Sequence, residues 1–189
     1  MKKRAAHIVI VGGSAGSYPL IMDLLRVLPA HFSSALIIVT HRNPKFSTKF
    51  EEMLSERFNR EIIQATDKAP IEEGGIYFAT PGYHLLIEPD QRFSLDISER
   101  IQYARPAIDV LFETAGEVYR ENCTAFLLSG ANKDGSDGMS RLRLAGSTTI
   151  VQCPNDAPIP TMPLHAIEAN QGIAIYTNRQ ILSYFRNLI

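Results

Sequence analysis

The chain has 189 residues, of which 45% are hydrophobic, and this is enough to bury the core of one ordinary domain. Its 19 Lys and Arg side chains nearly balance its 20 Asp and Glu side chains, so the formal net charge is −1. This balance excludes a globally cationic surface, and we expect neither nucleic acid nor an anionic membrane as a partner. Two cysteines, Cys123 and Cys153, are too few for a disulfide framework or a four-thiolate zinc site, and we expect both to be reduced.

The N-terminal region does not have the pattern of a secretion signal. Its apolar run, residues 8–11, ends in two glycines and is shorter than the roughly 7–15 residues of a signal-peptide core. No apolar run approaches the ~20 residues that a membrane-spanning helix needs. We therefore expect a cytoplasmic protein without membrane insertion.

The first part of the chain alternates short apolar runs with segments of helical period. Residues 8–11 and 35–39 are fully apolar and predict two buried strands. Leucines at positions 20, 24, 25 and 28 repeat at helical spacing between them, and a second helix is predicted over residues 47–58. Continuous apolar strands separated by amphipathic helices predict a parallel sheet that is covered on both faces.

The middle of the chain changes character before the same pattern resumes. Three short runs, residues 76–79, 84–88 and 93–97, are separated by turn sequences and predict an antiparallel hairpin element. Helices are then predicted over 109–119, 138–144 and 179–188, and strands over 124–128, 148–152 and 173–176. We predict a single doubly wound α/β domain over residues 1–189, with a mostly parallel sheet, helices on both faces and the hairpin as an insertion.

Polar residues follow three of the predicted strands. Ser14 follows the first strand, His41 the second, and Asp134 lies in the loop after the strand at 124–128. Ligands of open α/β sheets bind at the carboxyl ends of the strands, where such loops converge. A hydroxyl, an imidazole and a carboxylate are the set that nucleophilic hydrolysis requires.

Each of these residues also has a purely structural interpretation. Ser14 could cap the following helix, because serine is a preferred N-cap residue. His41 could be an ordinary loop histidine, and Asp134 could serve only in a turn or as a cap before Gly135. Asp137 is a competitor for the role of the acid.

The glycine cluster around Ser14 distinguishes between three functions. Residues 12–16 do not read G-x-G-x-x-G, and His41 stands where a dinucleotide site needs an acidic residue. They also lack the Gly-Lys-Ser/Thr ending of a phosphate loop, so a nucleotide-dependent enzyme is disfavoured. They do match G-x-S-x-G, in which small residues let a serine stand on a tight strand-to-helix turn. The chain order Ser14, His41, Asp134 differs from the Ser, acid, His order of true α/β-hydrolases.

Three segments of the chain are distinctive when taken together: residues 8–16, ending in Gly-Gly-Ser-Ala-Gly, residues 76–88, and residues 105–112, which read Arg-Pro-Ala-Ile-Asp-Val-Leu-Phe. In combination they resemble the catalytic domain of the chemotaxis protein-glutamate methylesterases, the CheB family. Residues 127–138 and 151–168 are also similar, so the resemblance covers nearly the whole chain in the family's order. The family commonly has Ser-Thr-Gly-Gly, Gln-His-Met and Gly-Met-Gly where this chain has Ser14-Ala15-Gly16-Ser17, Thr40-His41-Arg42 and Gly130-Ala131-Asn132.

The resemblance implies an activity and a set of site residues. It implies hydrolysis of glutamate γ-methyl esters on the cytoplasmic helices of methyl-accepting chemoreceptors, with release of methanol, and often deamidation of receptor glutamines. It implies a catalytic triad of Ser14, His41 and Asp134. We expect the backbone N–H groups of Ala15 and Ala131 to form the oxyanion hole, and no metal or cofactor is needed.

The resemblance also raises the questions of substrate binding and of regulation. Receptor helices carry acidic residues, so exposed cations beside the triad should bind them, and Arg42 and Lys133 are the candidates. Family members usually carry a receiver domain, for which there is no room before His7, so we expect either that the chain is a fragment from which the receiver domain is deleted or that its regulation comes from elsewhere, for example from a separate receiver domain. The alternative is a CheB-like binding module with weak or no catalysis, because fold alone does not establish function.

Overall fold

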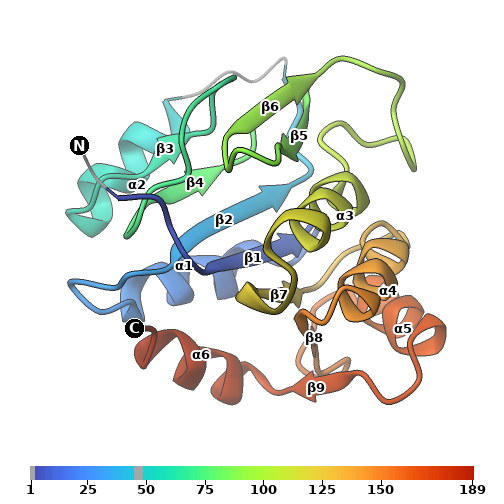
Figure 1. Cartoon of the computed structure of the whole chain (residues 1–189). Helices are drawn as coiled ribbons and strands as arrows, with labels where there is room; N and C mark the ends of the chain where they lie inside the picture. The colour runs from blue at the N-terminus through green and yellow to red at the C-terminus, as the bar shows by residue number, and fades with distance from the viewer. Residues whose placement is uncertain (1–2, 45–48) are drawn as a thin grey trace.

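The computed structural model describes residues 3–44 and 49–189, and a sheet of seven parallel strands forms its centre (Figure 1). Strand order across the sheet is β3-β4-β2-β1-β7-β8-β9. The strands are β1 (Ile8–Gly13), β2 (Ala35–Thr40), β3 (Ile63–Gln64), β4 (Ile76–Phe78), β7 (Cys123–Leu127), β8 (Thr148–Gln152) and β9 (Ala174–Tyr176). The predicted doubly wound α/β fold is confirmed.

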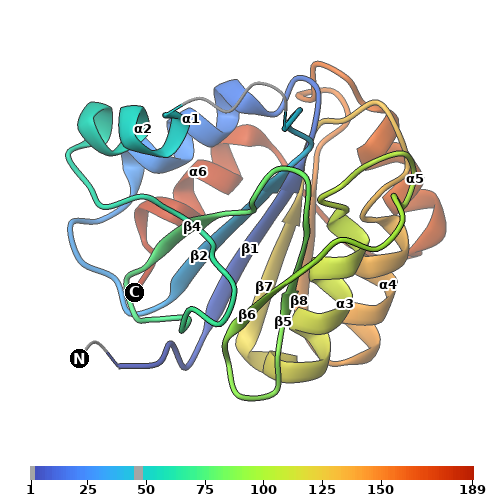
Figure 2. The ribbon, with the colours of Figure 1, turned by 90° about the horizontal axis from the view of Figure 1, so that it is seen from above.

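Helices cover both faces of this sheet, as Figure 2 shows most clearly. One face carries α1 (Tyr18–Val27), α2 (Phe50–Phe58) and α6 (Asn178–Arg186), and the other carries α3 (Ile108–Tyr119), α4 (Ser136–Leu144) and α5 (Thr161–Ala169). A short 3-10 turn, η1 (Arg120–Asn122), joins α3 to β7. No helix in the described part of the chain is long and apolar enough to cross a bilayer.

The alternation of side chains along β1 explains the two-layered core. Ile8 and Ile10 pack on the α3 side of the sheet, whereas Val9 and Val11 pack on the α1 side. Both sets are buried completely, since successive side chains of a strand point to opposite faces. A strand that is buried on both faces has to be apolar throughout, which is the pattern seen in the sequence.

The middle segment differs in part from the prediction. The strands β5 (His84–Ile87) and β6 (Phe93–Asp96) do form an antiparallel hairpin. However, the run at residues 76–79 does not belong to it, because β4 pairs in parallel with β2 and β3 inside the main sheet. A three-residue run of buried strand carries no periodic signal that could place it in one sheet or the other.

Helix α5 has no counterpart among the predicted elements. Prolines at positions 158, 160 and 163 surround its start and make the segment look like a loop. Pro163 nevertheless lies in the first turn of α5, where the missing N–H leaves no helical bond unmade. The predicted helix at 47–58 begins at Phe50 among the described residues, and Ser47 lies outside them.

The strand order defines where a ligand can bind. The chain builds outward from β1 through β2 to one side, and later through β7, β8 and β9 to the other. β1 and β7 are therefore neighbours at which the winding reverses. The crevice at the carboxyl ends of such strands is the binding position of open α/β sheets.

Gly12 lies where α3 packs closely on β1, and the substitution of Gly12 gives a first prediction. A Cβ at position 12 would lie 2.6 Å from Cγ2 of Ile108 and 2.9 Å from Cζ of Phe112. Gly12→Ala should therefore lower the free energy of unfolding by about 1–3 kcal/mol, because a packed core has no room for another methyl group. Urea denaturation followed by circular dichroism measures this loss.

The matched control removes the group that the added methyl would meet. Ile108→Ala takes away Cγ2 of Ile108, so the loss in the double variant should be smaller than the sum of the losses of Gly12→Ala and Ile108→Ala. Strictly additive losses would contradict the steric explanation.

Candidate active site

The three residues of the expected triad follow the strands at the centre of the sheet. Gly13 of β1 pairs with Thr40 of β2, so the next residues, Ser14 and His41, leave the sheet side by side. β7 pairs with β1 on its other side, and the loop after β7 carries Asp134. The parallel register therefore brings all three chain segments to one edge of the sheet.

His41 and Asp134 form a short hydrogen bond. Nε2 of His41 lies 2.7 Å from Oδ2 of Asp134, and the Asp134 carboxylate is completely buried. An ionised carboxylate only accepts hydrogen bonds, so Nε2 carries the hydrogen and Nδ1 keeps its lone pair. The structure therefore leaves Nδ1 as the basic atom of the ring.

The same carboxylate also binds the start of α3. Oδ2 of Asp134 accepts from the N–H of Ile108 at 2.8 Å, and Oδ1 accepts from the N–H of Asp109 at 3.0 Å. These are the first two N–H groups of α3, which have no partner within the helix. Both hydrogen bonds are charge-assisted, and the positive end of the helix dipole also attracts the carboxylate. Asp134 is thus a cap, as its structural interpretation suggests, but it caps α3 and not α4.

The side chain of Asp109, in turn, binds the start of the neighbouring helix α4. Its Oδ1 accepts a hydrogen bond of 2.7 Å from the N–H of Gly138 in the first turn of α4. Burial first, and then the nearby carboxylates of Asp134 and Asp137, raise the pKa of Asp109 to about 7 against the lowering effect of the Gly138 bond. A carboxyl group that holds a proton near neutral pH therefore lies behind the His41–Asp134 pair.

Ser14 lies on a turn that neighbouring groups hold from two sides. Its N–H donates to the carbonyl of Ser129 at 2.9 Å, and its carbonyl accepts from the hydroxyl of Ser17 at 2.7 Å. The left-handed backbone of this turn falls on Gly16, with φ of +82°, and not on Ser14. The turn is therefore unlike the strained elbow of α/β-hydrolases, in agreement with the different chain order.

Ser14 does not cap α1, because Ser17 occupies the N-cap position. Among the described residues, Oγ of Ser14 has no hydrogen-bond partner, and Nδ1 of His41 has none either. Bonds between a nucleophile and its base often form only in the complex with substrate. The structure joins His41 to Asp134 and leaves Ser14 free on the adjacent strand end.

Ser129 is a positioning residue that was not among the expected site residues. Its hydroxyl donates to the carbonyl of Ala15 at 2.8 Å and accepts from the N–H of Ile159 at 2.9 Å, while its own N–H donates to Oε1 of Gln152 at 2.7 Å. Ser129 therefore connects the Ser14 turn to the loop between β8 and α5. The signal available in the sequence was a polar residue directly after the apolar strand at residues 124–128.

The two expected oxyanion donors are exposed and free. In the described part of the chain, neither the N–H of Ala15 nor that of Ala131 donates a hydrogen bond. An oxyanion hole needs donors without a partner in the resting protein. Asp137, the competitor for the acid, is exposed and belongs to the first turn of α4.

The expected role of Arg42 as an exposed cation is not met. The Arg42 side chain is only 13% exposed, and Nη2 binds Oε1 of Glu51 at 2.6 Å and the carbonyl of Ala79 at 2.9 Å. Its guanidinium also lies 4.8 Å from the ring centre of Phe50. Arg42 therefore holds α2 against the sheet. Lys133 is exposed, as expected for a residue that binds substrate.

A cavity of about 520 Å³ adjoins His41. Its wall is formed mainly by the end of β2, by Asn132 and by the segment between β6 and α3. The lining residues are His41, Arg42, Asn43, Pro44, Arg100, Gln102, Tyr103, Ala104, Arg105 and Asn132. The charged residues among them are all arginines.

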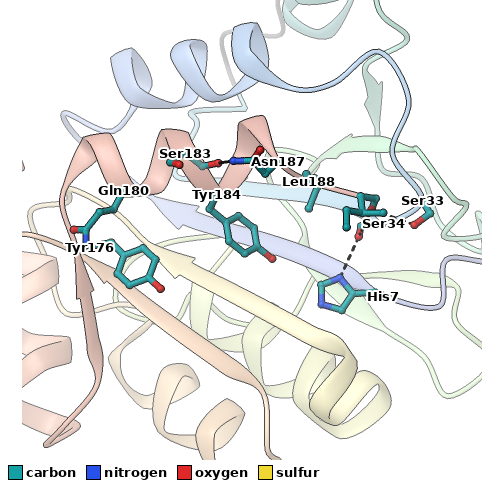
Figure 3. A pocket seen from close by; sticks show the side chains of 10 residues that line it. His7, Ser33, Ser34, Tyr176, Gln180, Ser183, Tyr184, Asn187 and Leu188 are labelled. Atoms are coloured by element: carbon teal, nitrogen blue, oxygen red, sulfur yellow. Dashed lines mark hydrogen bonds between the residues drawn. The ribbon is translucent and has the colours of Figure 1, made fainter.

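Another cavity, of about 670 Å³, lies away from these residues (Figure 3). Its lining includes His7, Ser34 and Tyr184, which belong to the segments before β1 and β2 and to α6. These positions are at the amino ends of the strands, opposite the crevice. Burial lowers the pKa of His7, whose Nδ1 lies 3.2 Å from Oγ of Ser34. No member of the expected triad lines this cavity.

Comparison with known proteins identifies the family. The model of the CheB methylesterase family matches residues 9–184. A Leptospira interrogans protein with the provisional name protein-glutamate methylesterase/protein-glutamine glutaminase is 38% identical over 180 residues, which cover 95% of this chain and 93% of that protein. This chain belongs to the CheB methylesterase family.

Relatives with longer chains and a crystal structure agree with this assignment. The protein-glutamate methylesterase/protein-glutamine glutaminase of Caldanaerobacter subterraneus is 34% identical over 85% of this chain but only 46% of its own length. The crystal structure of the Thermotoga maritima CheB methylesterase catalytic domain matches with a TM-score of 0.85 and 26% identity, over 97% of this chain and 98% of that domain. The match therefore extends over a whole catalytic domain.

The raised pKa of Asp109 gives a prediction for stability. The folded protein holds this proton up to about pH 7, whereas the unfolded chain loses it near pH 4. The contribution of Asp109 to stability is therefore complete below about pH 4 and is lost as the pH rises through about 7. Asp109→Asn keeps an acceptor for Gly138 and cannot ionise, so its free energy of unfolding should fall less between about pH 4.5 and about pH 7.5 than that of the wild type.

Urea denaturation at several pH values measures this difference, with Asp109→Ala as the comparison that also loses the Gly138 bond. Parallel pH profiles for Asp109→Asn and the wild type would mean that Asp109 is already ionised in the folded protein.

Proposed function

We propose that this chain hydrolyses glutamate γ-methyl esters on the cytoplasmic helices of chemoreceptors and releases methanol, with deamidation of receptor glutamines as a related activity. The observation that carries the proposal is the 2.7 Å hydrogen bond between His41 and the buried Asp134. His41 follows the strand that pairs with the strand before Ser14, and the chain belongs to the CheB methylesterase family. Relatives named as protein-glutamate methylesterases support the choice of substrate.

The first half of the reaction transfers the acyl group to the enzyme. Nδ1 of His41 takes the proton of the Ser14 hydroxyl while Oγ attacks the ester carbonyl. The N–H groups of Ala15 and Ala131 stabilise the oxyanion. Methanol leaves with the proton that Nδ1 returns to it, and the glutamyl group remains esterified to Ser14.

The second half releases the product with the same groups. Nδ1 of His41 takes a proton from water, which attacks the acyl-enzyme, and Oγ of Ser14 leaves with that proton. Asp134 keeps the hydrogen on Nε2 throughout and stabilises the imidazolium that forms in each half. The product is a glutamate carboxylate. Amide hydrolysis of a glutamine follows the same steps with ammonia as the leaving group.

A second candidate is a CheB-like module that binds receptors with weak or no catalysis. The observation that favours it is the absence of a hydrogen bond between Ser14 and His41 in the described structure. Methanol release from methylated receptor distinguishes the two candidates directly.

The first functional prediction concerns Ser14. Ser14→Ala should lower kcat by several orders of magnitude, because the reaction has no other nucleophile and members of a triad act as a unit. The assay is methanol release from a methylated receptor fragment, with an unchanged melting temperature as the control for folding. Near-normal turnover by Ser14→Ala would exclude the proposed mechanism.

The second functional prediction concerns the acid. All three groups around the Asp134 carboxylate are donors, so the amide of Asp134→Asn would place its NH₂ against another N–H. We expect kcat to fall by about 10⁴-fold, by analogy with the Asp→Asn variant of the serine-protease triad, and the stability to fall as well. Asp137→Asn is the matched control and should leave kcat within about twofold, since Asp137 is exposed. A larger loss in Asp137→Asn than in Asp134→Asn would reverse the assignment.

A further inference from the structure

The cavity beside His41 has an unusual charge. Among the residues that the structure describes, three arginines and no acidic side chain line it. Arg42 is neutralised by Glu51, but in the described part of the chain neither Arg100 nor Arg105 forms an ion pair. Arg100 is exposed, and the guanidinium of Arg105 binds only the backbone carbonyls of Ile97 and Ser98. The cavity therefore offers uncompensated positive charge for a carboxylate.

The segment that borders this cavity exposes three large apolar side chains, of which Tyr103 lines the cavity itself. Tyr103 is 94% exposed, and Ile97 and Ile101 are also exposed. All three lie between β6 and α3, in residues 97–105, which we call the rim loop. Single exposed apolar residues are common, but here three lie in one short segment that lines a charged cavity. Such a combination fits the surface of an amphipathic acidic helix better than a small polar molecule.

The rim loop is held in place by internal bonds. The completely buried His84 accepts from the N–H of Ala107 at 3.2 Å and donates from Nε2 to the carbonyl of Glu99 at 2.9 Å. Nη1 of Arg105 donates to the carbonyls of Ile97 and Ser98, each at 2.7 Å. These bonds join both ends of the loop to the hairpin and to α3. The loop is therefore ordered before a partner binds, which reduces the entropy lost on binding.

The tip of the rim loop has a backbone that its residues disfavour. Ile101 and Ala104 bond to each other across a two-residue turn, at 3.1 and 2.8 Å. The two residues in between, Gln102 and Tyr103, have φ of +50° and +63°. This turn prefers Asn-Gly, because side chains are strained at positive φ. A fully exposed tyrosine at such a position gains nothing for folding, so its presence points to function.

We infer that the rim loop is a docking surface for an acidic helical segment of the substrate protein, in which Arg100 binds a carboxylate and Tyr103 packs on the helix. This inference rests on the proposed function, since it assigns the residues that select which glutamyl ester reaches Ser14. It assigns the substrate-binding role that was expected of Arg42, whose charge Glu51 already neutralises, to cations that are free to bind.

The test uses kinetics with three substrates. The first is a helical peptide with one glutamyl γ-methyl ester flanked by glutamates, the second has glutamines as flanking residues, and the third is a small neutral ester. Arg100→Gln should raise KM for the acidic peptide about fivefold to tenfold and lower its salt dependence, with less than about a twofold change for the other two substrates. Arg186→Gln, an exposed arginine at the end of α6 far from the cavity, is the matched control.

The tip of the loop provides a separate variant. Gln102→Asn combined with Tyr103→Gly should raise KM for both peptides about fivefold and, by relieving the strained turn, raise Tm by about 2–4 °C. Tyr103→Phe should leave KM unchanged because it keeps the ring. A gain in Tm with unchanged KM for the peptides would overturn the role of Tyr103. Equal losses of Arg100→Gln on the acidic peptide and the small ester would overturn the role of Arg100.

Binding measurements separate this inference from the proposed function. Fluorescence anisotropy of the labelled acidic peptide with Ser14→Ala protein needs no catalysis. Binding that Arg100→Gln weakens supports the docking surface even where the wild type fails to release methanol. Absence of binding at protein concentrations up to about 1 mM, alongside an active wild type, overturns the docking surface and leaves the proposed function intact.

Discussion

The structure around the site depends on one buried carboxylate. Removing the Asp134 charge from water costs several kcal/mol unless donors replace the water, and three N–H groups do so here. These donors come from the end of β2, through His41, and from the first two residues of α3. Asp134 itself lies between β7 and α4. A single set of bonds thus fixes the position of three chain segments and the orientation of the imidazole.

The neighbouring carboxyl group explains how this charge is kept. Asp109 and Asp134 lie close together, and two adjacent carboxylates in a buried site do not both ionise. Three donors surround Asp134, whereas the side chain of Asp109 accepts from Gly138. The proton is therefore favoured on Asp109, whose pKa is raised to about 7 by burial first and by the neighbouring carboxylates second. The two carboxyl groups also cap two helices. Asp134, which lies just before α4, binds the start of α3, and Asp109, which lies in α3, binds the start of α4. The same pair that prepares the acid therefore also packs the two helices.

The sequence predicts those parts of the site that the sheet itself determines. A buried strand has to be apolar, so its end is marked by the first polar residue, and Ser14 and His41 follow from this rule. Side chains that come into contact only when the chain folds are not marked in the sequence in this way. Arg42 looks like a loop cation because Glu51, which neutralises it, lies on a helix whose direction the sequence does not reveal. Asp109 reads as an ordinary residue in the first turn of a helix until the approach of α4 places another carboxylate beside it. The sequence also does not reveal which sheet β4 joins, because this depends on the strands that pair with it.

The proposed triad and the proposed docking surface meet at the start of α3. Shortly after the rim loop the chain reaches Ala107, which is the N-cap of α3 and donates to His84, and the next N–H groups along the chain bind Asp134. A substrate that presses on the end of the loop next to α3 would therefore act on the acid, whereas contacts at the tip, around Tyr103, are separated from it by the His84 anchor. Changes near residue 107 should consequently affect kcat and KM together, and changes at the tip should affect KM alone. The hairpin insertion contributes to this separation, because β5 supplies His84, whose two hydrogen bonds lie between the tip of the proposed docking surface and the proposed triad.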